Sequence, residues 1–294
     1  MIKIENVSTV GWEVAIRGAR NPMNSWDKSD TMFLDYAEDD CVVVCHDISG
    51  VMHRIIPEDW SDKLYDGVKI GPNDLKLLSN LAKAGSDEAK FRRMIVVYVD
   101  ITAPMYWWKE ADTYKVGTVR NSCSTMHKIH AKKFTLEDFS YDHIGSAESE
   151  LQRCIDILNI ARGMFLRTKD KAHWWSMIQL LPSSYNQRAT LMLNYEVLAN
   201  MYHARKNHKL DEWHDFCAWV ETLPYAKELI VDAGHEDTED QLRARFKSYE
   251  NQIEYLEITM AKELYSRGMS TLDISEKIGI GESTIRKIVE ENKS

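Results

Sequence analysis

Apolar and polar positions alternate at the start of the chain and then recur at every third or fourth residue. The alternation predicts a strand, and the later spacing predicts an amphipathic helix that continues to about residue 20. Further on, the runs Cys41–Cys45 and Val51–Ile56 flank the turn sequence Asp47-Ile48-Ser49-Gly50 and predict a β-hairpin. A helix is predicted from Pro72 to about Ala84, where a glycine follows.

The middle of the chain passes from an extended to a helical pattern. The run Met94–Ile101, rich in Val and Ile, predicts a strand, and Pro104 near a first turn predicts a helix to about Tyr114. Helical spacing of apolar residues returns from Ser146 to Arg167. Further helices are predicted over residues 184–193, 195–204 and 213–220. The predicted fold class is therefore α+β, with a helical C-terminal half.

The last 40 residues have a pattern of their own. Gly268 and Gly279 mark turns between three short predicted helices. Six apolar residues are expected to form their small core: Leu264, Ile274, Ile278, Ile280, Ile285 and Ile288. This pattern is similar to the helix-turn-helix of resolvases and many regulators. That resemblance implies a recognition helix that would present four residues to DNA, namely Ser283, Thr284, Arg286 and Lys287.

The charge of this C-terminal segment leaves its role open. From Tyr255 onward it has six Lys or Arg and seven Asp or Glu, a net charge of −1. Binding driven by phosphate contacts favours a basic face instead. A packing or oligomerisation module is therefore an alternative to a DNA-binding unit.

Composition narrows the class of protein. A chain of 294 residues with a net charge of −9 can form a full core, and its acidity disfavours wide electrostatic binding to nucleic acid or to anionic membranes. No apolar run approaches the ~18 residues that a membrane helix needs. The first six residues do not resemble a signal peptide. We therefore expect a cytoplasmic protein with no membrane partner.

The five cysteines are an odd, scattered set, which fits a reducing compartment. Cys41 and Cys45 with His46 suggest a metal pair, but no second Cys/His pair at zinc-finger spacing follows. A short apolar strand is the better interpretation of this run, so no metal is expected.

Four polar residues stand out in an otherwise apolar stretch: Arg188, Asn194, Asn200 and Arg205. On a helix, Arg205 would share a face with Asn194 and Leu198. An arginine on an apolar face needs an anion or carbonyl groups, because burying it unpaired is costly. A phosphate or the imide edge of a pyrimidine would satisfy it through a planar fork. An ion pair with an Asp or Glu of the chain itself is the alternative.

The run Leu181–Arg188, followed by Asn194, Asn200 and Arg205, resembles in its spacing the C-terminal half of the flavin-dependent thymidylate synthases. The strand that leads into Ala103-Pro104 also resembles that family's approach to its signature. The early segment Ala15–Arg20 resembles the family's N-terminal helix, so the similarity spans roughly residues 10–225. It implies an antiparallel sheet with helices, followed here by the helix-turn-helix unit.

The resemblance also implies roles for individual residues. Substrate, a deoxyuridylate, would be held by Arg188 and Arg205, with Thr118 and Ser124 nearby. FAD would be held by Asn194 and Asn200, with Tyr114 and Lys115. Trp107 and Trp108 are interpreted as core residues rather than flavin contacts. A homotetramer with active sites shared between subunits is implied as well.

The signature of that family is altered in this chain. The sequence Arg-His-Arg-x-x-Ser is replaced by Thr113-Tyr114-Lys115-Val116-Gly117-Thr118, so Lys115 keeps one positive charge and Thr118 keeps a hydroxyl. Glu196 stands where the family usually has arginine. A further substrate arginine is missing, and three nearby residues are candidates to replace it: Arg120, His127 and Lys128.

The altered signature leaves three interpretations open. The first two are catalytic: a flavin-dependent transfer of a one-carbon unit from methylene-tetrahydrofolate to C5 of a pyrimidine deoxynucleotide, giving either a hydroxymethyl or a methyl product, with NADPH as a candidate reductant. The third is a nucleotide-binding protein that has lost catalysis and acts as a DNA-binding regulator. We expect the enzyme, divided into a thymidylate-synthase-like domain (1–233), a linker (234–254) and a helix-turn-helix domain (255–294).

Overall fold

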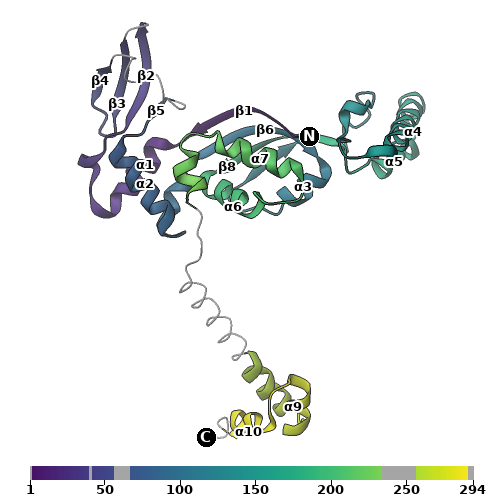
Figure 1. Ribbon diagram of the computed structural model, residues 1–294. Coiled ribbons are helices and arrows are strands. Elements are labelled where there is room, and N and C mark those ends of the chain that lie inside the picture. The colour runs from purple at the N-terminus through teal and green to yellow at the C-terminus, as the bar shows by residue number, and fades with distance from the viewer. Residues whose placement is uncertain (1, 40–41, 56–66, 234–255, 291–294) are drawn as a thin grey trace. The chain divides into compact units, whose positions relative to one another are not determined.

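The computed structural model describes residues 2–39, 42–55, 67–233 and 256–290 (Figure 1). The chain divides into two compact units, Met1–Gly234 and His235–Ser294. The predicted linker, 234–254, lies outside the described residues, and the domain boundaries proposed from the sequence stay predictions.

An antiparallel four-stranded sheet carries the main core of the first unit. Its strand order is β1 (Lys3–Val10), β6 (Val96–Pro104), β8 (Asn186–Asn194) and β7 (Val119–Ser122). One face of this sheet is covered by α3 (Met105–Ala111), α6 (Tyr195–Arg205) and α7 (Asp211–Glu221) (Figure 1). The α+β class with an antiparallel sheet is thereby confirmed.

Alternation along the strands decides which side chains enter this core. Ile101 of β6 and Leu191 of β8 are buried under the helices, whereas Arg188 points to the opposite face of the sheet and is exposed. Trp107 and Trp108 of α3 are both buried, which confirms their interpretation as core residues.

The predicted helix over 184–193 is wrong, because most of this segment forms strand β8. Its apolar run Ala-Thr-Leu-Met-Leu is too short for periodicity to distinguish a strand from a buried helix. Pairing decides the outcome: Ala189 lies opposite Ile101 on one side and opposite Ser122 on the other. The next helix begins at Tyr195, as predicted.

A second antiparallel sheet follows the order β4 (Met52–Ile55), β3 (Val42–Asp47), β2 (Met32–Asp39) and β5 (Val68–Lys69). Strands β3 and β4 form the predicted hairpin. Cys45 lies in β3, as the strand interpretation of that run requires, whereas Cys41 lies outside the described residues. Helices α1 (Trp12–Arg20) and α2 (Pro72–Ala84) also form where the sequence predicts them.

A buried ion pair ties α1 to α2. The Nε of Arg20 donates to Oδ1 of Asp74 at 2.6 Å, and the two side chains are 4% and 0% exposed. The other carboxylate oxygen accepts from the hydroxyls of Ser29 and Thr31, and Arg20 also donates to the carbonyl of Ser25. Every group of this pair is satisfied, so it fixes the chain between the two helices.

The remaining elements of the first unit include α4 (Glu148–Thr168) and α5 (Lys171–Leu180), which pack on each other through Leu151, Ile155, Leu158 and Met177. Short 3-10 turns occur at Asn21–Met23, Trp26–Lys28, Ala89–Met94, Leu136–Asp138 and Gly145–Ala147, and a π-helical turn at Lys227–Val231.

The second unit has three helices in its described part: residues 256–266, α9 (Thr271–Ile278) and α10 (Glu282–Glu290). Ile274 and Ile285 are buried, and the other four residues predicted for its core are partly buried against them. None of the helices in the described ranges of the chain has the length and apolar composition that a bilayer crossing requires.

Candidate functional site

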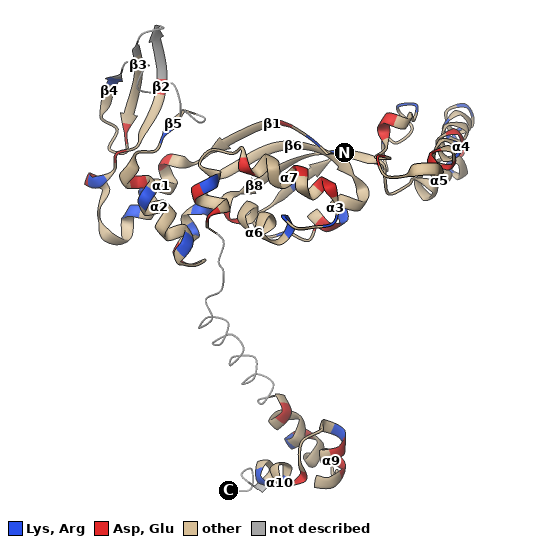
Figure 2. Cartoon of the chain, in the orientation of Figure 1, with Lys and Arg blue, Asp and Glu red and all other residues tan. Residues whose placement is uncertain are grey.

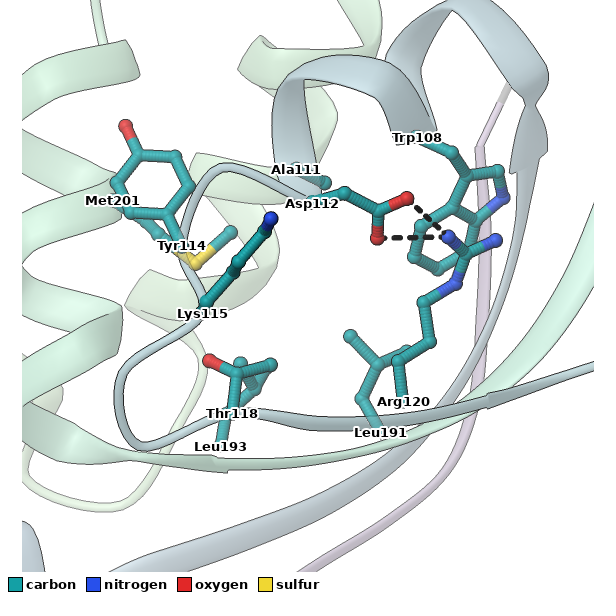
Figure 3. A pocket seen from close by; sticks show the side chains of 10 residues that line it. All are labelled: Trp108, Ala111, Asp112, Tyr114, Lys115, Thr118, Arg120, Leu191, Leu193 and Met201. Carbon is teal, nitrogen blue, oxygen red and sulfur yellow. Dashed lines mark hydrogen bonds and ion pairs between the residues drawn. The ribbon is translucent and has the colours of Figure 1, made fainter.

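A small cavity lies beside the loop that joins α3 to β7 (Figure 3). Its volume is about 110 Å³. Its lining combines apolar and polar side chains in equal number. The lining residues are Trp108, Ala111, Asp112, Tyr114, Lys115, Thr118, Arg120, Leu191, Leu193 and Met201. Three predicted site residues therefore meet here, namely Tyr114, Lys115 and Thr118.

Arg120 is the most firmly held cation of this cavity. It lies opposite Leu191 in the sheet, so its side chain enters the face covered by helices. The guanidinium stacks 3.9 Å from the centre of the Trp108 ring and donates to both oxygens of Asp112, at 2.8 and 2.6 Å (Figure 3). Another donor reaches the side-chain oxygen of Gln187 at 2.7 Å. The stacking and the ion pair fix its plane.

Several donors of the cavity have no partner of their own. The Thr118 hydroxyl and the Nε of Arg120 are buried without a hydrogen-bond partner among the described residues. Lys115 points into the space between Tyr114 and Asp112 (Figure 3), and no carboxylate within the described ranges pairs with its ammonium group. Buried polar groups are normally satisfied, so the two buried donors favour a ligand with acceptor atoms, and the exposed Lys115 ammonium adds a positive charge beside them.

The backbone of the loop is clamped against α6. Gly117 has φ of +76°, and a Cβ atom there would lie 2.8 Å from Nδ2 of Asn194 and 3.1 Å from a methyl group of Val197. Asn194 is also the N-cap of α6, because its Oδ1 accepts from the backbone N–H of Val197 at 3.0 Å. Asn194 therefore shapes the loop, and only a glycine fits at position 117.

Arg205, at the end of α6, forms the ion pair that the sequence left open as an alternative. It donates to Oε2 of Glu110 at 2.9 Å and to the hydroxyl of Tyr114 at 3.0 Å. Its guanidinium lies 5.0 Å from the centre of the Trp213 ring. His208 is 3.2 Å from the same oxygen of Glu110. Arg205 is thus tied to the cavity through Tyr114.

Arg188 lies on the other face of the sheet. It donates to Oδ2 of Asp100 at 2.8 Å, and the same carboxylate accepts from Thr190 and Asn6. These hydrogen bonds, the one from Thr190 first, hold the pKa of Asp100 well below its usual range. The pairing raises the pKa of Arg188 in turn. Within one protomer, Arg188 and Arg205 therefore do not meet.

The other predicted residues lie apart from the cavity. Asn200 is exposed on α6, and the hydroxyl of Ser124 accepts from the backbone N–H groups of Met126 and His127 in an exposed turn. Glu196 is paired with Arg93, which neutralises the acidic residue at the position where the resembled family has arginine.

The four residues predicted to contact DNA are exposed on α10: Ser283, Thr284, Arg286 and Lys287. Arg286 is paired with Glu282 at 2.8 Å. Figure 2 shows both basic and acidic residues on the described helices of this unit rather than one basic face.

The cavity fits one ring rather than three. An engineered apolar cavity of roughly 150 Å³ takes up benzene, so a volume of about 110 Å³ is suited to the edge of a single six-membered ring. The donors Lys115 and Thr118 match the carbonyl groups of a pyrimidine or of a flavin edge. The donor groups of the cavity therefore fit the predicted ligands, and its volume has room for one edge of an isoalloxazine rather than for all three rings.

Sequence reasoning missed the contacts that shape this site. The sequence pattern does not mark Asp112 or Glu110, although each holds an arginine of the site. Arg120 was only one of three candidates for the missing cation. In strand β7 Arg120 is half-buried between exposed neighbours, and this alternation marks it as facing the cavity. A strand of four residues is too short for the alternation to be recognised in the sequence.

Comparison with solved structures identifies the fold as that of the flavin-dependent thymidylate synthases. ThyX from Helicobacter pylori with FAD and dUMP superposes with a TM-score of 0.54 and 13% identity, over 79% of this chain and 99% of that one. A second structure of that enzyme, complexed with FAD and dUMP, gives a TM-score of 0.51 and 14% identity over 79% and 100%. The UMP/dUMP methylase PolB from Streptomyces cacaoi, bound with 5-Br dUMP, gives 0.45 and 14% over 79% and 95%. No family model and no curated protein matches the sequence.

Proposed function

We propose that the chain is a flavin-dependent enzyme that transfers a one-carbon unit to C5 of a pyrimidine deoxynucleotide. The fold match over almost the whole length of ThyX carries this proposal. The cavity adds to it, because the segment that replaces the family signature, Thr113–Thr118, supplies several of its lining groups. Fold alone does not fix an activity, so the donor groups of the site bear the chemical part of the proposal.

In this proposal the side chains bind and polarise the substrate, and none attacks it. Lys115 and the Thr118 hydroxyl would contact carbonyl oxygens of the pyrimidine or of the flavin edge, and Arg205 would exchange its bond to Glu110 for an anionic group of the nucleotide. Bound FAD would supply the hydride, and methylene-tetrahydrofolate the carbon. Asn194 keeps the loop in the shape that presents these donors.

Arg188 and Arg205 lie on opposite faces of the sheet, and this arrangement supports a site shared between subunits. Arg188 faces away from the cavity of its own protomer, on the face that also carries the Asp100 carboxylate. A neighbouring subunit would have to bring such a residue to the cavity. We therefore propose a homo-oligomer, a tetramer in the resembled family, in which Arg188 of one subunit completes the site of another.

The first test is the visible absorption spectrum of the purified full chain, before and after incubation with FAD and gel filtration. Retention of about one flavin per subunit, strengthened by dUMP, is expected. The retained flavin should fall when Lys115 is replaced by methionine, while the fold seen by circular dichroism is unchanged. Absence of retention with nucleotide present would end the flavin proposal.

The product is decided by a second assay. Reduced protein, dUMP and methylene-tetrahydrofolate are incubated, and the nucleotide is analysed by mass spectrometry for a methyl or a hydroxymethyl group at C5. A methyl group indicates thymidylate synthesis, and a hydroxymethyl group indicates that water rather than hydride completes the reaction. NADPH would be tested as the reductant in the same assay.

A second candidate is a nucleotide-responsive DNA-binding regulator. The observation in its favour is the exposure of Ser283, Thr284, Arg286 and Lys287 together on α10 of a three-helix unit. Retention of the full chain on duplex DNA should then fall steeply with salt and change when dUMP is added. The double variant Arg286→Gln/Lys287→Gln should lose retention. Binding that does not depend on salt or on these residues would contradict this candidate.

A further inference from the structure

Helix α4 exposes apolar side chains on the side that does not contact α5. Ile157 and Ile160 are 51% and 67% exposed, whereas Leu151, Ile155, Leu158 and Ala161 on the other side are buried. Isoleucine is an uncommon choice for an exposed helix position, because its burial is favourable by about 1.5–3 kcal/mol. Two of them lie one turn apart on the same side of the helix.

A regular spacing extends this surface along the helix. The residues Glu150, Arg153, Ile157, Ile160, Met164 and Arg167 follow one another at intervals of three, four, three, four and three. This alternation of three and four is the spacing of the residues that face the partner helix in a coiled coil. Here it continues for about two and a half heptads. We call these six residues the α4 seam. Its centre is apolar and its ends are charged.

The order of the charges fits a second copy of the same helix in antiparallel orientation. Centred between Ile157 and Ile160, such a pair places each of these isoleucines opposite the other. Glu150 then lies opposite Arg167 at both ends of the seam, and Arg153 opposite Met164. A parallel pair would place Glu150 opposite Glu150 and Arg167 opposite Arg167, which is unfavourable.

The side chains at the two ends of the seam are available for such contacts. Arg167 lies against the sulfur of Met164 at 2.7 Å and has no carboxylate partner within the described part of the chain. Glu150 is paired with Arg153 at 3.0 Å on the surface, where both are largely exposed. An exposed pair of this kind contributes only about 0–1 kcal/mol, so exchange for Arg167 of a partner costs little.

We propose that two copies of the chain associate through the α4 seam as an antiparallel helix pair about a twofold axis. With 21 residues, α4 is about 31 Å long, so the seam is a small contact surface. The proposal assigns a surface to association and stands independently of flavin binding and of catalysis.

Sedimentation velocity of the full chain over a hundredfold range of concentration tests the proposal. The wild type should associate reversibly, and Ile160→Lys should weaken the association constant about 100-fold, because two lysines would be buried at the centre of the seam. Gln152→Lys is the matched control, since both substitutions place a lysine four residues from Asp156 and residue 152 is exposed on another side of α4. The control should associate like the wild type.

A charge exchange tests the orientation of the pair. Glu150→Arg and Arg167→Glu should each weaken association, about tenfold for two repelling end pairs, and the double variant should recover it. A wild type that is monomeric at every concentration, or an oligomer that Ile160→Lys leaves unchanged, would overturn the proposal. Failure of the double variant to recover association would overturn the antiparallel arrangement. Flavin retention is measured on the same Ile160→Lys samples, so loss of association through the α4 seam and loss of flavin binding are scored separately.

Discussion

Two arginine–carboxylate pairs of the first unit have the same chemistry in different surroundings. Arg20 and Asp74 are almost fully buried, and neighbouring hydroxyl and carbonyl groups complete their hydrogen bonds. Arg120 and Asp112 lie at the rim of the cavity, where Asp112 is half exposed and one donor of Arg120 has no partner. An ion pair whose hydrogen-bonding groups all have partners serves to hold the fold together. An ion pair that leaves a donor without a partner can offer that donor to a ligand.

Replacing the aspartate of each pair by asparagine should give the largest difference in stability between the two pairs. Asp74→Asn leaves the guanidinium of Arg20 buried without a counter-charge, and the free energy of unfolding should fall by about 3–5 kcal/mol. Asp112→Asn at the rim should cost about 1 kcal/mol or less, because solvent and the Trp108 ring still stabilise the cation. Urea unfolding of both variants measures the difference. Equal losses would contradict the contrast between the two pairs.

The arginine at the end of α6 should affect ligand binding more than stability. Arg205→Lys keeps the charge but loses the planar fork, so binding of dUMP should weaken about 10- to 100-fold. The unfolding free energy should change by about 1 kcal/mol or less, because the side chain is partly exposed. Isothermal titration calorimetry measures the first quantity and urea unfolding the second. A large loss of stability with unchanged binding would make Arg205 a structural residue.

The unpaired hydroxyl of the cavity should show opposite effects on stability and binding. Thr118→Val keeps the shape of the side chain and removes a buried oxygen that has no partner among the described residues, so stability should rise by about 1 kcal/mol. Binding of dUMP or FAD should weaken about tenfold. Thr190→Val is a comparison variant, because that hydroxyl donates to Asp100. It should lower stability instead, and a rise in both variants would be inconsistent with the assignment.

The pair on the open face of the sheet should show the smallest effect, visible as a pH dependence. The pKa of Asp100 is held below its usual value, mainly by the hydrogen bond from Thr190. Its contribution to stability is therefore full above the ordinary carboxyl pKa of about 4 and is lost as the pH falls through the lower folded pKa. Thermal midpoints of the wild type and Asp100→Asn should differ at pH 7 and converge toward pH 2. A constant difference would contradict the shift.

Local patterns predicted much of the first unit but not its long-range pairing. The hairpin of β3 and β4 and helices α1, α2, α4 and α6 form close to the expected positions. Strand β8 was predicted as a helix, because its two partners, β6 and β7, are distant in sequence and alone decide its conformation. Strand β2 and helix α5 were not predicted.

In the candidate site, too, contacts between residues close in sequence could be predicted, and contacts that depend on strand pairing could not. Tyr114, Lys115 and Thr118 are close in sequence, and their grouping could be anticipated from the altered signature. The contact of Arg120 with Trp108 could not, because it depends on the register of β7 against β8. Arg188 and Arg205 are predicted to hold the same substrate, and within one protomer strand alternation places Arg188 on the other face of the sheet.

The contact between Gly117 and Asn194 fixes the backbone of the loop without using the side chains that line the cavity. Its geometry depends on a glycine, an N-cap amide and one methyl contact, and none of these three is a donor that lines the cavity. The side chains of Lys115 and Thr118 are therefore not part of the contacts that hold the loop backbone, whereas the hydroxyl of Tyr114 also accepts a hydrogen bond from Arg205. Substitution of Lys115 and Thr118 should therefore alter ligand preference while the backbone of the loop is kept, because the glycine and the N-cap that shape it are left in place.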